Sequence, residues 1–182
     1  MNEKDVISEN GIREYTLNKS IPFSFHIYDL IDSTNIRMKE FAENGEPEWS
    51  VVISESQMMG KGRLGRTFFS PSDTGIYMTI LLRPSISPED TTKITTAMAV
   101  AVAETIEDVS GQKINIKWVN DIYISDKKVC GILTECVTDT GVLKPKYIIL
   151  GIGINLFTSK EGFPQELSCI AGAILDKRKD IL

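Results

Sequence analysis

The sequence predicts an α+β domain with a mixed, mostly antiparallel sheet flanked by helices. Runs of β-branched and aromatic residues outnumber the helical patterns, and several runs are separated by connections too short to hold a crossover helix. The chain has 182 residues, a length that suits a single domain. We therefore expect one folded domain over residues 23–182, preceded by an N-terminal extension over residues 1–22.

Each element of this prediction rests on a local pattern. Strand-like runs cover residues 23–31, 49–54, 75–82, 113–118, 121–124, 128–136 and 145–154, with a hairpin turn at residues 125–127. A short helix should follow the N-cap run Asp32-Ser33-Thr34-Asn35, a long helix should begin at Pro88 and end before Gly111, and a C-terminal helix should cover residues 164–177. The glycine-rich, polar residues 57–74 are expected to form a loop.

Charge and hydropathy exclude several classes of protein. Lysine and arginine number 20 and aspartate and glutamate 25, so the net charge is −5 and we expect no nucleic-acid partner. The apolar runs are too short to span a bilayer and the polar N-terminus is not a signal peptide, so we expect a cytoplasmic protein without a membrane partner. The three cysteines should be reduced and mostly buried, and His26 should be a packing residue.

The loop beginning at Gln57 carries the first chemical signal. Lys61, Arg63 and Arg66 alternate with three glycines between residues 60 and 65, and no acid follows until Asp73. Glycine lets the backbone approach a ligand closely, and arginine can hold two phosphate oxygens at once. This composition favours a nucleotide or acyl-phosphate ligand, although a solvated basic loop explains the segment alone equally well.

A second signal is the segment Lys117-Trp118-Val119-Asn120-Asp121. Lys117 would offer a point charge to a carboxylate or phosphate, and Asn120 and Asp121 carry the oxygen ligands that Mg²⁺ prefers. A plain turn is the stronger interpretation of this segment alone, because asparagine and aspartate favour turns.

Two further segments fit a ligand site. Asp32-Ser33-Thr34-Asn35 is explained by helix capping, or by hydroxyl and amide groups that hold a polar ligand such as a ureido ring. Residues 151–155 (GIGIN) lack the third glycine and the opening helix of a dinucleotide fingerprint, so they indicate a strand that something approaches closely.

Together these segments resemble the catalytic domain of bacterial biotin protein ligases. The resemblance rests on residues 32–35 (DSTN), Gln57, residues 60–68 (GKGRLGRTF), Ser70-Pro71, residues 117–121 (KWVND), residues 131–135 (GILTE) and residues 151–155 (GIGIN), which follow the family order. It covers about residues 23–175 and implies a fold related to class II aminoacyl-tRNA synthetases and biotin–lipoyl ligases.

The resemblance also implies a reaction. A ligase of this family joins biotin to ATP as biotinyl-5′-AMP, then transfers biotin to a lysine of the biotin carboxyl carrier protein of acetyl-CoA carboxylase or a related carboxylase. Biotin, ATP and Mg²⁺ are the implied substrates and cofactor. Lys117, at the reacting carboxylate and α-phosphate, and Arg63 are the implied catalytic residues.

The implied contacts fall into three groups. Biotin would contact Ser33, Thr34, Asn35, Gln57, Gly60, Lys61, Gly62, Arg63, Lys117 and Gly131. The nucleotide would contact Arg63, Arg66, Phe68, Lys117, Asn120 and Asn155. Asp121 would bind Mg²⁺.

The chain departs from the family pattern at three positions and at its ends. Lys61 replaces an arginine and loses the bidentate fork, Phe68 replaces a tryptophan, and Val119 replaces a proline. The chain stops at Leu182, before the SH3-like domain that family members often carry, so we expect reduced turnover. Residues 1–22 are too few for a winged helix-turn-helix, and we expect a monomer or weak homodimer.

Two alternatives remain at this point. One is a lipoate or octanoate transferase of the same superfamily. The glycine–arginine loop is evidence against this alternative. The other is a truncated module that binds biotin with little catalysis, for which the missing C-terminal domain is the support.

Overall fold

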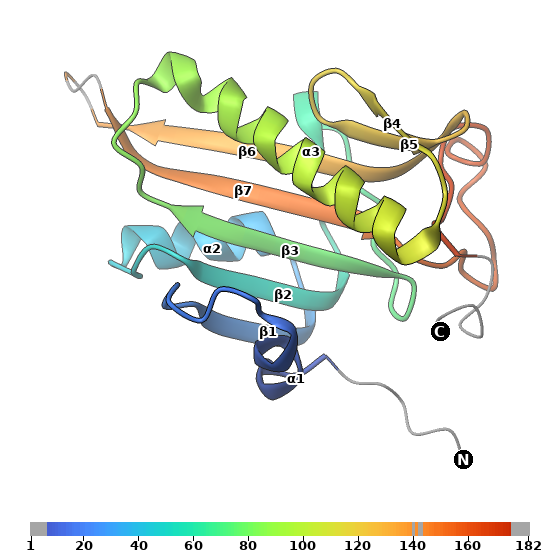
Figure 1. Ribbon diagram of the computed structural model, residues 1–182, viewed down its shortest axis with the longest axis horizontal. Coiled ribbons are helices and arrows are strands. Elements are labelled where there is room, and N and C mark those ends of the chain that lie inside the picture. The colour runs from blue at the N-terminus through green and yellow to red at the C-terminus, as the bar shows by residue number, and fades with distance from the viewer. Residues whose placement is uncertain (1–6, 140, 142–143, 176–182) are drawn as a thin grey trace.

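A seven-stranded sheet in the order β1-β2-β3-β7-β6-β5-β4 forms the centre of the computed structural model, which describes residues 7–139, 141 and 144–175 (Figure 1). Its strands are β1 (Ser24–Ile31), β2 (Ser50–Gln57), β3 (Gly75–Leu82), β4 (Ile114–Lys117), β5 (Asp121–Ile124), β6 (Lys127–Thr138) and β7 (Pro145–Asn155). β1 and β2 run parallel and the other neighbouring pairs run antiparallel. The predicted mixed, mostly antiparallel sheet is confirmed.

Helices cover both faces of this sheet. Helix α2 (Thr34–Glu43) packs against β2, β3 and β7, and helix α3 (Thr91–Ser110), entered through the single 3₁₀ turn Pro88–Asp90, packs against β4, β5 and β6 (Figure 1). Strand β7 supplies both cores, because Tyr147 and Ile149 join the α2 cluster while Leu150 and Ile152 join the α3 cluster. Gly111 ends α3 with φ 65°, a left-handed conformation that glycine adopts without strain.

The short helix α1 (Glu9–Tyr15) lies within the expected N-terminal extension. The Arg13 guanidinium donates to the Phe23 carbonyl at 2.7 Å and lies 5.2 Å from the centre of the Phe25 ring. These contacts tie α1 to the first residues of β1. No helix in the described part of the chain is long and apolar enough to cross a membrane.

The predicted helix over residues 164–177 is wrong for its described part, residues 164–175. Residues 165–170 form turns, while the Lys128 amide donates to the Ile170 carbonyl and the Gly172 amide donates to the Lys128 carbonyl. The Asn155 side chain also donates to the Gly172 carbonyl. The segment closes only isolated turns of its own, with the Ser168 amide donating to the Pro164 carbonyl and the Ala171 amide to the Leu167 carbonyl. Its pairing with the ends of β6 and β7 takes the place of a continuous helix. Residues 176 and 177 lie outside the described residues.

Two smaller predictions have different outcomes. Cys130 is buried, but Cys136 and Cys169 are exposed, so the expectation of mostly buried cysteines is wrong. His26 is a packing residue: its Nε2 lies 2.7 Å from Glu46 Oε1, and its ring lies 4.6 Å from that of Phe41.

Candidate functional site

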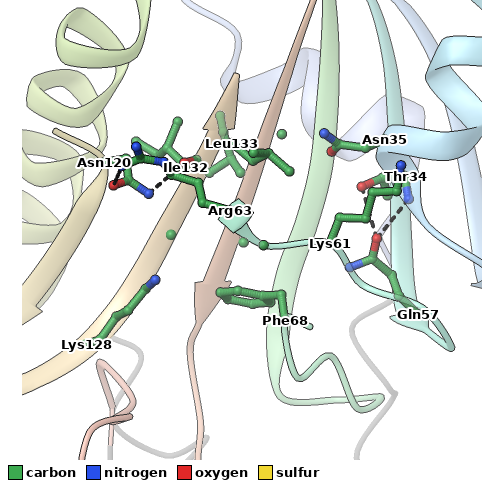
Figure 2. Close-up of a pocket in the computed structure, with 15 residues that line it drawn as sticks. Thr34, Asn35, Gln57, Lys61, Arg63, Phe68, Asn120, Lys128, Ile132 and Leu133 are labelled. Atoms are coloured by element: carbon green, nitrogen blue, oxygen red, sulfur yellow. Dashed lines mark hydrogen bonds between the residues drawn. The ribbon is translucent and has the colours of Figure 1, made fainter. Parts of the chain in front are cut away.

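A pocket of about 40 Å³ lies beyond the N-terminus of α2, on the face of the sheet that α2 covers (Figure 2). Its walls come from α2, the end of β2, the loop between β2 and β3, the turn between β4 and β5, and strands β6 and β7. The residues that line it are Thr34, Asn35, Gln57, Lys61, Gly62, Arg63, Phe68, Asn120, Lys128, residues 131–133 and residues 151–153. Segments far apart in the sequence therefore meet at one cavity.

One wall is a hydrogen-bonded set at the start of α2. Gln57 Oε1 accepts from the Thr34 amide at 2.8 Å and from the Thr34 hydroxyl at 3.1 Å (Figure 2). Gln57 Nε2 donates to Ser70 Oγ at 2.9 Å. Ser33 is the N-cap residue of α2, but its hydroxyl caps no backbone group and has no partner among the described residues, although Ser33 is 1% exposed. A buried hydroxyl without a partner is costly, so a bound ligand would find a free polar group here.

Asn35 continues this wall with both ends of its amide engaged. Its Nδ2 donates to Glu135 Oε2 at 2.8 Å, and its Oδ1 accepts from the Thr79 hydroxyl at 2.8 Å. A Cβ at Gly151 would collide with the Asn35 amide, so glycine at that position on β7 makes room for it. Sequence reasoning missed Glu135 and Thr79, because nothing in the sequence brings β3 and β6 to this asparagine.

The pocket floor is made of glycines under an aromatic ring. Cβ atoms built on Gly153 and Gly131 would lie 2.6 Å and 3.2 Å from carbons of the Phe68 ring, so this ring rests directly on the backbone of β6 and β7. The ring also meets Tyr77 edge to face at 6.3 Å, and burial raises the pKa of Tyr77. The floor is flat, apolar and narrow.

The glycine-rich loop crosses the pocket opening. Its backbone closes on itself, with the Gly62 amide donating to the Arg66 carbonyl at 2.7 Å and the Phe68 amide donating to the Gly60 carbonyl at 2.8 Å. Arg63 then reaches across to the turn between β4 and β5, where its guanidinium donates to Asn120 Oδ1 at 2.8 Å (Figure 2). The structure therefore joins the two segments that the sequence marks separately, residues 57–66 and residues 117–121.

Asn120 is buried, and the partly exposed Asp121 is hydrogen-bonded to it. Asn120 is 8% exposed, and its Nδ2 donates to the Ile132 carbonyl at 3.0 Å and to Asp121 Oδ1 at 2.9 Å. The same Asp121 oxygen pairs with Lys128 Nζ at 2.7 Å. The described residues contain no group of three histidine, cysteine, aspartate or glutamate side chains that would hold a metal. A single carboxylate already paired with an ammonium is a poor magnesium ligand.

The structure does not bring Lys117 into this pocket. Lys117 lies at the end of the edge strand β4, is exposed, and holds its ammonium 5.7 Å from the centre of the Tyr123 ring. The lysines that line the pocket are Lys61 of the loop and Lys128 of β6, and Lys128 Nζ would lie 3.1 Å from a Cβ built on Gly131. Asn155, also expected here, instead anchors the Gly172 segment.

The two remaining predicted residues differ in exposure. Arg66 is exposed on the loop, whereas Gly60 is buried and packed so tightly against Phe68 and Ser70 that no side chain fits there. The peptide bond between Trp118 and Val119 is cis. Behind the pocket, burial raises the pKa of the Cys130 thiol to about 12, so this cysteine is not a nucleophile at neutral pH.

Comparison with known proteins defines the class. The model of the Biotin/lipoate A/B protein ligase family matches residues 27–155, and the chain belongs to this family. The chain is 38% identical over 169 residues to the bifunctional ligase/repressor BirA of Bacillus spizizenii, an alignment that covers 92% of this chain and 51% of the relative. BirA of Escherichia coli is 32% identical over 134 residues, covering 73% of this chain and 40% of that one.

Among solved structures, the biotin protein ligase of Aquifex aeolicus in complex with biotin and ATP superposes with a TM-score of 0.68. It is 28% identical, and the match covers 83% of this chain and 59% of that one. The chain spans about half the length, or less, of the two curated relatives named above. The family resemblance expected from the sequence motifs is confirmed.

Proposed function

We propose that this chain is a biotin–[biotin carboxyl carrier protein] ligase domain that forms biotinyl-5′-AMP from biotin and ATP and then passes biotin to a carrier lysine. The observation that carries the proposal is the Arg63–Asn120 contact above Lys128, which gathers cations and amides over one glycine floor. Family membership and the likeness to a ligase that binds biotin and ATP support it.

The reaction needs little covalent chemistry from the protein. In the first step a biotin carboxylate oxygen attacks the α-phosphorus, an O–P bond forms, and pyrophosphate leaves with the electrons of the broken P–O bond. In the second step the carrier amine attacks the acyl carbon, AMP leaves, and the amine loses a proton. Both steps bring anions together or develop negative charge, so positioned cations supply most of the stabilisation.

Lys128 takes the role that the sequence suggests for Lys117. Its ammonium lies beside Gly131 at the pocket, where the carboxylate and α-phosphate would meet. Asp121 holds this ammonium at 2.7 Å before substrate enters. Arg63 and Lys61 would offset the phosphate charge from the loop side, and Arg66 would act at the rim.

The polar wall suits the ureido ring of biotin. Thr34, Gln57 and Asn35 present amides and a hydroxyl, and Ser33 adds a hydroxyl with no partner among the described residues. The glycine floor with Phe68 suits the aliphatic chain that links the ring system to the carboxylate. Lipoate lacks a ureido group and would offer this wall no matching polar atoms, so we expect biotin to be the preferred substrate.

The loop must move for biotin to enter. A cavity of about 40 Å³ holds only a few water molecules, since one water needs roughly 10–15 Å³. An open groove of about 640 Å³ lies on the outer side of the loop and shares Lys61, Gly62, Arg63 and Leu133 with the pocket. The loop is therefore the wall between the two spaces, and its displacement would join them.

Magnesium would reach the site with the phosphates of ATP, since Asp121 is already paired. The acceptor would be the carrier domain of acetyl-CoA carboxylase or a related carboxylase.

The direct test is incubation of the chain with ATP, Mg²⁺, biotin and a carrier domain, followed by detection of pyrophosphate, biotinyl-AMP and biotinylated carrier. Lipoate and octanoate serve as matched substrates. We expect biotin-dependent pyrophosphate release and carrier labelling. Biotin binding without pyrophosphate would instead indicate a biotin-binding module, and labelling with lipoate alone would indicate a lipoate ligase.

A further inference from the structure

Glu135 ends the motif at residues 131–135 but is in none of the expected sets of ligand-contacting residues, yet its carboxylate contacts a residue of the pocket wall. It sits on β6, and its Oε2 accepts from Asn35 Nδ2 at 2.8 Å. Asn35 itself is 5% exposed and lines the pocket, whereas Glu135 faces the groove on the outer side of the loop. Any effect of Glu135 on the substrate in the pocket would therefore pass through Asn35.

The contact determines which way the Asn35 amide points. An ionised carboxylate only accepts hydrogen bonds, so the amide must turn its NH₂ group toward Glu135. The opposite end, Oδ1, then faces Thr79, whose buried hydroxyl donates to it at 2.8 Å. Thr79 alone would not fix the orientation, since a hydroxyl can donate to Oδ1 or accept from Nδ2.

We propose that Glu135 is a positioning residue that makes Asn35 a hydrogen-bond donor toward the substrate. With Oδ1 engaged by Thr79 and one Nδ2 hydrogen engaged by Glu135, the second Nδ2 hydrogen is left for a ligand. A donor at this wall selects a substrate that presents a carbonyl oxygen. On the proposed function, on which this inference rests, that oxygen belongs to the ureido group of biotin.

Glu135→Gln is the sharpest variant because it keeps the size of the side chain and its capacity to hydrogen-bond Asn35. Glutamine can donate as well as accept, so both orientations of the Asn35 amide become possible. Asn35 could then present either an N–H donor or its carbonyl oxygen to the substrate. Glu135→Leu removes the hydrogen bond altogether. Cys136→Ser is the matched control, because Cys136 is the next residue on β6, is exposed, and lies outside this network.

The experiment measures binding of biotin and of 2-iminobiotin by calorimetry, together with the KM and kcat of adenylate formation. In 2-iminobiotin a nitrogen that carries hydrogen replaces the ureido oxygen, so it demands an acceptor where biotin demands a donor. For Glu135→Gln we expect biotin affinity to fall about tenfold, the ratio of biotin to 2-iminobiotin affinity to fall with it, and kcat to change by less than about threefold. Thermal stability should match that of the wild type.

The outcomes separate the inference from the proposed function. If the wild type does not bind biotin, the proposed function fails and this inference fails with it. If the wild type binds biotin but Glu135→Gln and Glu135→Leu keep its affinity and selectivity, the positioning role alone is overturned. Equal losses for both ligands, accompanied by a lower melting temperature, would show that Glu135 only supports the fold and would also overturn it.

Discussion

Removing the charge of Lys128 should slow adenylate formation far more than removing the charge of Lys117. Both lysines lie near the β4–β5–β6 hairpins, but the Lys128 ammonium lies at the pocket beside Gly131, whereas the Lys117 ammonium lies over the ring of Tyr123. Each substitution removes one positive charge, and the two differ only in where that charge lies. Comparing their rates therefore shows whether the position of the charge matters for adenylate formation.

The expected magnitude follows from the surroundings of each ammonium. A cation about 4 Å from a developing negative charge is worth about 4 kcal/mol at an effective dielectric constant of about 20. The Lys128 side chain is 30% exposed and Asp121 lies 2.7 Å from its nitrogen, so water and the carboxylate offset part of this attraction. We expect a loss of about 3 kcal/mol, or roughly a 100-fold slower first step. An exposed cation–π contact such as that of Lys117 is worth about 0.5–1 kcal/mol, and its loss should affect stability rather than rate.

The assay is pyrophosphate release at saturating biotin and ATP, with biotinyl-AMP measured by chromatography. Lys128→Met keeps most of the aliphatic chain and is the first variant, Lys128→Ala the second, and Lys117→Met the control. Thermal unfolding of each variant establishes that the pocket still folds when Asp121 keeps only its Asn120 partner. A Lys128→Met rate near that of the wild type, or an equal loss in Lys117→Met, would refute the assignment of the cation to Lys128.

Three further predictions follow from contacts around the pocket and the α2 helix. Arg63→Ala breaks the hydrogen bond to Asn120, so the adenylate should escape faster while its formation slows less; an unchanged release half-life of the bound intermediate would contradict this. Gly153→Ala places a Cβ 2.6 Å from the Phe68 ring, an overpacking that costs about 1–3 kcal/mol, so biotin affinity measured by calorimetry should fall about tenfold. The control Gly45→Ala has φ 88° and open space around it, and it should lower the melting temperature without changing biotin affinity. Hydrogen bonds from Lys146 and Tyr147 lower the pKa of Glu43 below its ordinary value of 4.5, so the stability it contributes is complete above that pH and is lost as the pH falls through the lower folded pKa. Between about pH 5 and pH 2 the melting temperature should therefore fall less steeply with decreasing pH for Glu43→Gln than for the wild type.

Local patterns were sufficient to predict most of the fold. The N-cap run before α2, the proline and glycine that bracket α3, and the alternating strands all act over a few residues, and each element lies within a few positions of its expected range. The C-terminal segment shows where local patterns fail. Its backbone groups bond to Lys128 and Asn155, which lie far away in the sequence, and no propensity of residues 164–175 contains that pairing.

The site also contains residues that local motifs predict and residues that only the tertiary structure reveals. The motifs predicted that Thr34, Asn35, Gln57, Arg63 and Asn120 belong to one ligand site, and all five line the same pocket. Each of them lies in a segment of unusual composition, which is why the sequence indicates it. Thr79 carries no such signal, and Glu135 belongs to the motif at residues 131–135 without any contact being expected for it. Their contact with the Asn35 amide arises only because β3, β6 and α2 meet there.

The resemblance implied Lys117 and not Lys128, and strand alternation would not have indicated Lys128 either. Side chains alternate along a strand, so if Gly131 and Leu133 face the pocket, strict alternation places Val129 on the pocket face and Lys128 in the core. The pairing of β5 with β6 breaks this alternation, since Ile122 opposes Cys130 and Tyr123 opposes Lys128, which leaves Val129 as an extra residue. Val129 and Cys130 are both fully buried in the cluster under α3, as consecutive residues can be only where the strand bulges. The bulge turns Lys128 to the pocket face and brings it to Asp121. A strict periodicity of two would therefore place Lys128 away from the pocket, which it lines together with Lys61 of the loop.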